Sequence, residues 1–311
     1  MNYKIIVNPT SGKGMGAQAV PLIREALDAQ GLRYDLVCTE RPWHAAELAQ
    51  EAAKSGYDVV AAAGGDGTLN EVLNGLILAK QAGANGVALG ALSVGRGNDF
   101  AYGGGIPHEL VEGVRVLAQG QRRTIDVGRV EGGFYPQGRY FGNGVGIGFD
   151  AVVGFEAAKL KHVHGFLSYM IAAIKTIFLY AKAPVLRIEY DGKTLVQPTL
   201  MVSIMNGRRM GGSFMMAPHS WLNDGLFDLC IAHQVSQVRI IKLISAIMKG
   251  TQESLPDITT GRTQRIVVTA VEGSLPAHAD GETLCTEGQQ LVMEVVAAQL
   301  DLITESTEFK A

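Results

Sequence analysis

Three times within its first 101 residues, this chain places a glycine-rich loop directly after an apolar, strand-forming segment. The loops span residues 8–14, 64–70 and 95–101, and the segments between them carry apolar residues at helical spacing. Strands that alternate with helices form parallel sheets, and such sheets bind ligands at the carboxyl ends of their strands. The sequence therefore predicts an N-terminal α/β domain with a parallel sheet, whose loops gather at one edge of that sheet.

The pattern of strands and helices changes near residue 122. Strand-forming segments then dominate, at 124–130, 140–146, 185–190, 199–205, 227–232, 265–271 and 291–296. Two stretches, 166–181 and 238–248, are predicted to be helical, and Asp191-Gly192 is typical of a hairpin turn. We expect an α/β domain over 1–123 and a mainly antiparallel β domain over 124–300. Residues 301–311 form a C-terminal tail, and its return to the first domain stays open.

The bulk composition favours a folded cytoplasmic protein. Hydrophobic residues make up 47% and charged residues 18% of the 311 residues, which is typical of a globular chain. The net charge of −3 gives no reason to expect a nucleic-acid partner. Cys38, Cys230 and Cys285 match neither a metal-binding spacing nor a disulfide framework, which predicts reduced thiols in a cytosol. The N-terminus lacks the features of a signal peptide, and the most apolar run, 166–181, is too short for a membrane span.

The first loop contains Asn8, Pro9, Thr10, Ser11 and Gly12 between a strand and a helix. Small residues let backbone N–H groups approach a phosphate, and the N-terminus of the following helix favours negative charge. The residues of this loop alone leave two interpretations open, a phosphate-binding loop and an ordinary polar turn.

The second loop holds one carboxylate, Asp66, among three glycines at the end of a buried strand. Glycine adopts backbone angles that are closed to other residues, so Asp66 is suited to hold a magnesium–phosphate unit there. An incidental Asp in a tight turn is the weaker alternative. Thr68 and Glu71 have the spacing of a capping box, which predicts that the next helix begins at Thr68.

The third loop leads into another predicted helix. Asn98 is expected to cap that helix, and Asp99 to lie in its first turn. Capping alone and a ligand-binding role both stay open for these two residues. None of the three loops is a Walker A motif, and none is the glycine fingerprint of a dinucleotide-binding fold.

The motifs NPTSGKG at 8–14, GGDGTLNEV at 64–72 and GNDFA at 97–101 together resemble the catalytic domain of diacylglycerol kinases, especially the soluble bacterial lipid kinases of the YegS/BmrU type. The similarity continues with FGNGVGIGFDA at 141–151, NDGLFD at 223–228 and HADGE at 278–282, and therefore spans nearly the whole chain. GGDGT alone also occurs in NAD kinases, whereas GGDGTLNEV followed by GNDFA is much more specific to the lipid kinases.

The resemblance implies that the chain binds ATP and Mg²⁺. The implied nucleotide site consists of Asn8, Pro9, Thr10, Ser11, Gly12, Thr39, Gly64, Gly65, Asp66, Gly67, Thr68, Leu69 and Asn70. Arg96 and Asn98 of the third loop complete the predicted site. The predicted catalytic residues are Asp66, Asp280 and Glu282, of which the resemblance implies Glu282 as the proton acceptor.

The resemblance also implies a structural Mg²⁺ that is held by the side chain of Asp224 and the backbone oxygens of Trp221 and Leu226. An Asp beside carbonyl groups in a tight turn suits a hard cation. The residues alone leave an ordinary Asn-Asp-Gly turn equally open.

The third loop departs from the family pattern at two positions, because Ser93 replaces the usual proline and Arg96 the usual threonine. Arginine offers a permanently charged fork that can hold two phosphate oxygens. We expect Arg96 to fold over the phosphates of ATP, because the loop should lie beside an anionic ligand. The alternative is an arginine that points into solvent.

The predicted helix over 166–181 is apolar over much of its circumference, and Lys159, Lys161, Lys175 and Lys182 flank or interrupt it. A lipid-facing helix at a membrane surface and a core helix both stay open. With the resemblance, this predicts a cytoplasmic lipid kinase of phospholipid metabolism, peripheral to the inner face of the membrane, that acts on a lipid with a free hydroxyl. An NAD kinase-like enzyme and a catalytically silent nucleotide- or lipid-binding regulator are the alternatives. The sequence fixes neither the lipid nor the oligomeric state, so a homodimer stays open.

Overall fold

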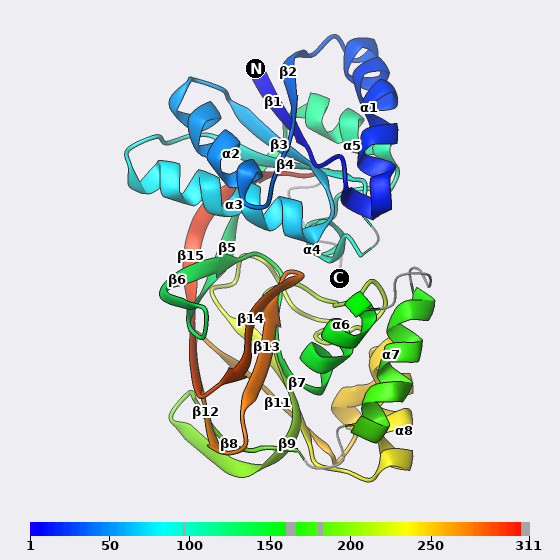
Figure 1. Cartoon of the computed structure of the whole chain (residues 1–311). Helices are drawn as coiled ribbons and strands as arrows, with labels where there is room; N and C mark the ends of the chain where they lie inside the picture. Colours follow the sequence, from blue (N-terminus) through cyan, green and yellow to red (C-terminus); the bar gives the residue numbers. More distant parts are fainter. Residues whose placement is uncertain (96, 160–165, 180–182, 306–311) are drawn as a thin grey trace. The chain divides into compact units, whose positions relative to one another are not determined.

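The structure is a computed structural model that describes residues 1–95, 97–159, 166–179 and 183–305 (Figure 1). The chain divides into two compact units: unit 1 comprises Met1–Val127 and the segment from Ala297 on, and unit 2 comprises Gly128–Val296. Along the chain, strands β5 (Arg122–Gly132) and β15 (Gln290–Ile303) each begin in one unit and end in the other. Within the described ranges, no helix has the length and apolar character that a membrane span requires.

Unit 1 alternates strands and helices around a parallel sheet of order β4–β3–β1–β2 (Figure 1). Its further elements are β1 (Asn2–Val7), α1 (Ser11–Ala29), β2 (Arg33–Cys38), α2 (His44–Lys54), β3 (Val59–Gly64), α3 (Asp66–Gln81), β4 (Ala88–Ser93), α4 (Asp99–Gly103) and α5 (Leu110–Gln119). All residues of β3 are buried, as expected for a central strand that helices cover on both faces. The end of β15 joins the same sheet in parallel beside β4, where Leu302 pairs with Leu89.

Helices pack on both faces of the sheet in unit 1. On one face, Leu27 of α1 and Leu117 of α5 share a core with Ile5 and Ala61 of the central strands. The other two long helices, α2 and α3, pack against each other. Their backbones approach closely because residue 75 is glycine, where a Cβ atom would stand 2.2 Å from the carbonyl oxygen of Ala46. The sheet is therefore buried on both sides, and its loops remain at its edges.

Unit 2 is mainly antiparallel, and β9 pairs antiparallel with β7, β8 and β10. Its elements are β6 (Tyr135–Phe141), β7 (Gly144–Gly148), α6 (Phe149–Lys159), α7 (Phe166–Leu179), β8 (Val185–Tyr190), β9 (Lys193–Met205), β10 (Phe227–His233), α8 (Gln237–Lys249), η1 (Gln252–Ser254), β11 (Ile258–Thr263), β12 (Arg265–Glu272), β13 (Leu275–Ala279) and β14 (Glu282–Gly288). The expected fold class, a parallel α/β unit followed by a mainly antiparallel β unit, is confirmed.

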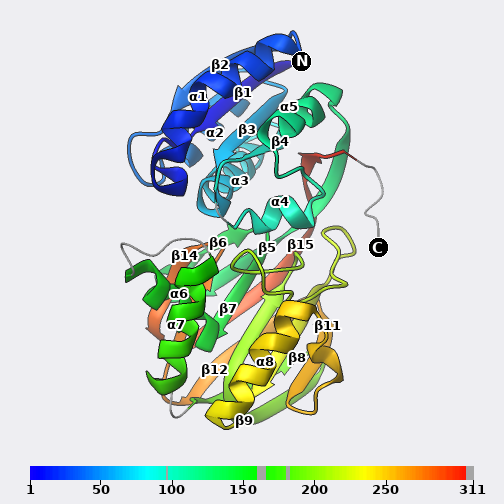
Figure 2. The ribbon, with the colours of Figure 1, turned by 90° about the vertical axis from the view of Figure 1, so that its right-hand side faces the viewer.

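Two cores hold unit 2 together. The first is built from strand residues such as Phe141, Ile204 and Phe227. The second lies between the strands and helices α6, α7 and α8, which Figure 2 shows on the side toward the viewer. Ala173 and Ile177 of α7 are buried in this second core, whereas the side chains at 166–170 and 178–179 lie outside the described residues. The described part of α7 is thus a core helix on one face.

Some sequence-based boundaries were wrong. Helix α3 begins at Asp66 and not at Thr68, and no capping box forms there. The Glu71 carboxylate instead accepts the backbone N–H of Ala45 at 3.1 Å, and the Thr68 hydroxyl accepts a hydrogen bond from Asn8. Tertiary partners therefore displaced the local cap. Helix α6 and the strands β11, β13 and β14 were not predicted, because they are short and carry no clear apolar period.

Candidate functional site

Thr68 joins the first two glycine-rich loops in unit 1. Its Oγ1 accepts a hydrogen bond from Asn8 Nδ2 at 3.0 Å and lies 3.4 Å from Ser11 Oγ. Glycine is required at position 64 for this approach, because a Cβ atom there would stand 2.6 Å from Thr68 Oγ1. The structure therefore brings together Asn8, Ser11, Gly64 and Thr68, four residues of the nucleotide site that the resemblance implies.

The first loop has an unusual backbone. Gly12, Lys13 and Gly14 all have left-handed φ angles, of 59°, 63° and 95°. Such angles are unfavourable for lysine, and strain of this kind is common at binding sites. The Asn8 side chain holds the start of the loop, since Oδ1 accepts both the N–H and the hydroxyl of Thr10, at 3.0 and 2.8 Å. The loop thus leads into α1 in a fixed shape, at a helix N-terminus that favours an anion.

Two carboxylates meet at the third loop. Asp66 Oδ1 accepts the backbone N–H of Phe100 at 3.1 Å. A Cβ atom on Gly97 would stand 2.9 Å from Asp66 Oδ2 and 3.2 Å from Asp99 Oδ2, so both carboxylates approach the same point. Paired carboxylate oxygens are ligands that Mg²⁺ prefers. Asp99 was absent from the residues predicted for the nucleotide and catalytic sites, although its place directly after Gly97 and Asn98 was a signal.

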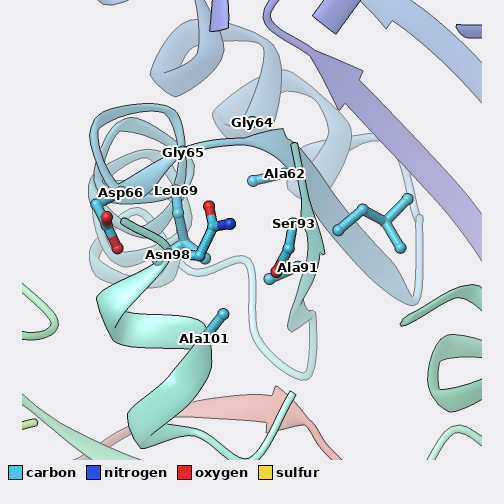
Figure 3. Close-up of a pocket in the computed structure, with 10 residues that line it drawn as sticks. Ala62, Gly64, Gly65, Asp66, Leu69, Ala91, Ser93, Asn98 and Ala101 are labelled. Atoms are coloured by element: carbon cyan, nitrogen blue, oxygen red, sulfur yellow. The ribbon is translucent and has the colours of Figure 1, made fainter. Parts of the chain in front are cut away.

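Asn98 lies beneath the Gly64–Gly65 turn (Figure 3). Its side chain is buried and donates a hydrogen bond to the carbonyl oxygen of Gly95 at 3.1 Å. Asn98 occupies the N-cap position of α4 and Asp99 lies in the first turn, as expected. The Asn98 backbone is left-handed and its side chain makes no capping hydrogen bond, so the expected side-chain cap is wrong. Asn98 and the turn both line a cavity of about 10 Å³, which is roughly the room of one water molecule.

The remaining predicted nucleotide residues differ in their settings. Thr39 follows β2, and its backbone N–H donates to the carbonyl oxygen of Val7 at 2.8 Å. Leu69 and Asn70 are buried inside α3, where Asn74 Nδ2 donates to Asn70 Oδ1 at 3.2 Å. Pro9 and Gly67 are partly exposed within their loops. Arg96 lies outside the described residues.

In unit 2, the Asp280 carboxylate binds the backbone of residues 142–144. It is buried and accepts three backbone N–H groups, from Gly142 at 2.6 Å, Asn143 at 3.1 Å and Gly144 at 3.0 Å. The backbone of Asp280 is itself left-handed, with φ at 47°. A carboxylate with this many donors is suited to hold neighbouring segments in place. These contacts hold the turn in place, and the catalytic role predicted for Asp280 stays a prediction.

Glu282 begins β14, directly after that turn, and faces Ala279 across the β13–β14 hairpin. It is half-buried. Its carboxylate forms no ion pair with any residue of the described ranges. Asp280 thus holds the start of the hairpin strand from which the Glu282 side chain extends.

Asp150, Ser203 and His278 form a polar cluster at β13, the first strand of the same hairpin. A Cβ atom on Gly146 would stand 2.3 Å from Asp150 Oδ2 and 2.6 Å from His278 Nε2. Ser203 Oγ lies 3.3 Å from Asp150 Oδ2. Desolvation raises the pKa of Asp150 to about 7 and lowers the pKa of His278 to about 4. Burial therefore disfavours the charged form of each group. Both residues lie in the motifs at 141–151 and 278–282, but neither was predicted as a site residue.

The predicted structural cation site at Asp224 holds a guanidinium in this structure. Leu226 donates its backbone N–H to Asp224 Oδ1 at 3.1 Å, and Arg262 forms an ion pair with Oδ2. Arg262 also reaches Asp228 Oδ1 at 3.3 Å, while Asp228 Oδ2 is buried without a hydrogen-bond partner. Burial raises the pKa of Asp228, and Arg262 opposes this rise. The donor set suits a cation, and Arg262 supplies the positive charge here. No group of three His, Cys, Asp or Glu side chains within the described ranges could hold a metal ion.

Comparison with known proteins covers both halves of the chain. Residues 2–130 match the family described as the diacylglycerol kinase catalytic domain, and residues 143–304 match the YegS C-terminal NAD kinase beta sandwich-like domain. The chain is 31% identical over 281 residues to a diacylglycerol kinase of Bacillus subtilis (strain 168), covering 90% of this chain and 89% of that protein. It is 30% identical over 280 residues to a diacylglycerol kinase of Staphylococcus aureus (strain NCTC 8325 / PS 47), covering 90% and 85%.

Solved structures show the same fold. A crystal structure of a diacylglycerol kinase from Bacillus anthracis str. Sterne matches with a TM-score of 0.71 at 21% sequence identity, covering 98% of this chain and 97% of that chain. A second structure from the same organism matches with a TM-score of 0.77 at 23% identity and the same coverage. At these identities the structural likeness establishes the fold alone.

Proposed function

Because the chain belongs to the diacylglycerol kinase family, we propose that it is an ATP-dependent lipid kinase, which transfers the γ-phosphate of ATP to a hydroxyl group of a lipid such as diacylglycerol. The observation that carries this proposal is the convergence of Asp66 and Asp99 at Gly97, in the third of the glycine-rich loops. Phosphoryl transfer depends on positioning and charge neutralisation. Two carboxylates for Mg²⁺ next to loops that suit phosphate would supply both.

The loop cluster suits the nucleotide. In this proposal the loop over residues 8–14 and the N-terminus of α3 receive the phosphates through backbone N–H groups. Asp66 and Asp99 would hold Mg²⁺, which would supply positive charge to neutralise the phosphates. The Asn8–Thr68 hydrogen bond of 3.0 Å keeps the two loops together.

Glu282 is proposed as the proton acceptor for the lipid hydroxyl. An aliphatic hydroxyl is a poor acid, so the proton leaves late, as the new phosphorus–oxygen bond forms. A carboxylate without an ion-pair partner can take that proton. Asp280 contributes by fixing the hairpin that carries Glu282. Since the acceptor is a lipid, we propose that the protein acts at the cytoplasmic face of a membrane in phospholipid metabolism.

The test is a labelled-ATP assay against a panel of acceptors. Diacylglycerol, ceramide, a sphingoid base and an isoprenoid alcohol are offered in mixed micelles, with NAD as a water-soluble acceptor. We expect label in at least one lipid and none in NAD. Label in NAD alone would support an NAD kinase-like enzyme, and ATP binding without any labelled product would support a silent regulator. Asp66→Asn serves as the inactive reference, and Asp35→Asn, on the edge strand β2, as its matched control.

A further inference from the structure

Helix α8 carries apolar residues on its outward face as well as its inward face. Ile240, Leu243 and Ile247 are buried in the core beneath it. Val238 and Ile241 point the other way, with 70% and 59% of their surfaces exposed. Single exposed apolar residues are ordinary, but two bulky ones one turn apart on one helix face form the start of a patch.

Helix α7, the neighbour of α8, also carries exposed apolar residues. Ile174 is 51% exposed and Ile171 is 38% exposed, although the neighbouring Ala173 is buried. The two helices are adjacent, because Gln237 Nε2 at the start of α8 donates to the carbonyl oxygen of Ile177 at 3.4 Å. Figure 2 shows both helices on the viewer's side of unit 2. We define the outer helix face as Ile171, Ile174, Val238 and Ile241.

The charges around the outer helix face have one predominant sign. Every charged residue of α8 is basic, namely Arg239, Lys242 and Lys249. Arg239 pairs with Asp257 at 2.5 Å, whereas Lys242 and Lys249 form no ion pair with any residue that the structure describes. On α7, Lys175 shares Glu156 with Lys159, at 2.5 and 2.6 Å. We define the lysine rim as Lys175, Lys242 and Lys249.

We infer that the outer helix face docks onto the surface of an anionic lipid bilayer, with its apolar side chains at the acyl boundary and the lysine rim on the headgroup phosphates. Helices with an exposed apolar face and flanking lysines lie in membrane interfaces in this way. A lipid surface is favoured over a second copy of the chain, because two such faces in contact would bring the lysine rims together and repel. The inference rests on the proposed function, since a kinase for a bilayer lipid must reach that bilayer.

The experiment is co-sedimentation of the full chain with vesicles, without ATP. Vesicles of phosphatidylcholine alone are compared with vesicles that also contain phosphatidylglycerol, at low and high salt. We expect binding to the anionic vesicles at low salt that weakens as salt screens the lysines. Lys242→Gln with Lys249→Gln should weaken it by about fivefold per lysine, the effect of one charge near an anionic surface. Val238→Ser with Ile241→Ser should weaken it by roughly tenfold, since less apolar surface is buried.

The matched control is Val196→Ser with Val271→Ser, because these valines are 54% and 50% exposed on strands of the same unit. This control should bind as the parent does, and all variants should keep the parent melting temperature. Absent vesicle binding, salt-independent binding, or equal binding by all variants would overturn the inference. Self-association that the α8 substitutions abolish, measured by sedimentation equilibrium, would assign the face to a second copy instead. Vesicle binding needs no turnover, so a chain that binds vesicles but labels no lipid would refute the proposed function and leave the docking face standing.

Discussion

The two halves of the candidate machinery are built in different ways. In unit 1, loops at the carboxyl ends of parallel strands come together, and glycines let side chains such as Asp66 and Asp99 approach one point. In unit 2, a single buried carboxylate, Asp280, holds a turn by accepting three backbone N–H groups from a segment 136 to 138 residues earlier. The loops of unit 1 depend on glycines, which have no side chain, whereas the turn in unit 2 depends on the side chain of Asp280.

The difference determines whether the backbone of each region depends on its carboxylates. A glycine-built loop tolerates changes in its carboxylates, because its backbone is held by other contacts such as the Asn8–Thr68 hydrogen bond of 3.0 Å. A turn that is built on one carboxylate does not tolerate its loss. Substitutions in unit 1 should therefore affect ligand binding more than folding. In unit 2, some substitutions should lower activity and others should lower stability, according to the residue.

The largest effect is expected at Glu282. Glu282→Gln should lower turnover by about 10²–10⁴-fold, the usual loss for a general base, because the amide cannot accept the proton of the lipid hydroxyl. Initial rates with saturating ATP and lipid measure this, and the melting temperature should stay unchanged. Glu287→Gln, an exposed residue on the same strand, is the control. A Glu282→Gln enzyme with near-normal turnover would remove Glu282 from the mechanism.

The next effect is on folding and concerns Asp280. Asp280→Ala leaves three buried N–H groups without their acceptor, and each unsatisfied buried group costs about 1–3 kcal/mol. We expect the free energy of unfolding to fall by about 3–5 kcal/mol in denaturant titrations. Asp280→Asn keeps one acceptor oxygen and should lose less. Equal stability of both variants and the parent would show that the turn is held by something else.

In unit 1, the carboxylates should act on the nucleotide and leave the fold intact. Asp66→Asn and Asp99→Asn should each weaken Mg²⁺-dependent ATP binding by roughly tenfold or more, the loss of one charge-assisted contact of about 1.5–3 kcal/mol. Gly97→Ala should have a similar effect, because its methyl group would lie 2.9 Å from Asp66 Oδ2 and 3.2 Å from Asp99 Oδ2. Calorimetry with ATP, with and without Mg²⁺, measures this. Variants that unfold cooperatively at the parent melting temperature but no longer bind ATP would sharpen the contrast with Asp280. Variants that bind ATP with the parent's affinity would contradict the prediction.

The smallest effect is a pH dependence that belongs to unit 2. Desolvation raises the pKa of Asp150 to about 7, so this residue lowers stability as pH rises from about 4 to 7. Desolvation lowers the pKa of His278 to about 4, so this residue lowers stability as pH falls from about 6.5 to 4. The two slopes oppose each other in the parent protein. Asp150→Asn should raise the unfolding free energy at pH 7 by on the order of 2 kcal/mol, given about 1.4 kcal/mol per pKa unit and partial contact with water.

The same variants check the sign of each slope. In denaturant titrations across this range, Asp150→Asn should leave a stability that rises with pH, and His278→Gln a stability that falls with pH. Parallel pH profiles for both variants and the parent would show that neither group is desolvated by folding.

The fold of unit 1 was largely predictable because its strands, loops and helices follow one another in short repeats along the chain. The strand–loop–helix repeats place residues such as Asn8, Asp66 and Asn98 at strand ends, and parallel strands bring such ends to one edge. The predictions that were wrong concerned side chains that could bind either a neighbour in the sequence or a residue far away in it. Thr68 and Glu71 had the spacing of a cap, but Asn8 and Ala45 bind them instead.

Unit 2 was less predictable because its decisive contacts join distant segments. Neither the contact of Asp280 with Gly142 nor the pairing of Arg262 with Asp224 leaves a periodic trace in the sequence. Antiparallel strands of five to seven residues, such as β13 and β14, give weak patterns. The resemblance pointed to Asp280 and Glu282, whereas the three backbone N–H groups that Asp280 accepts are visible only in the structure.

The return of β15 to the first sheet has a consequence for biosynthesis. Besides the Leu302–Leu89 pair, Ala298 donates its N–H to Asp126 Oδ1 at 2.7 Å, and the Thr304 hydroxyl donates to the carbonyl oxygen of Gly104 at 2.7 Å. Unit 1 is therefore a discontinuous domain, and unit 2 is continuous between its two pieces. Chains emerge from the ribosome N-terminus first, so the domain that begins first is completed last. The nascent chain carries an uncovered β4 edge until residues 297–305 have left the exit tunnel, and an exposed strand edge is where chaperones and neighbouring chains bind.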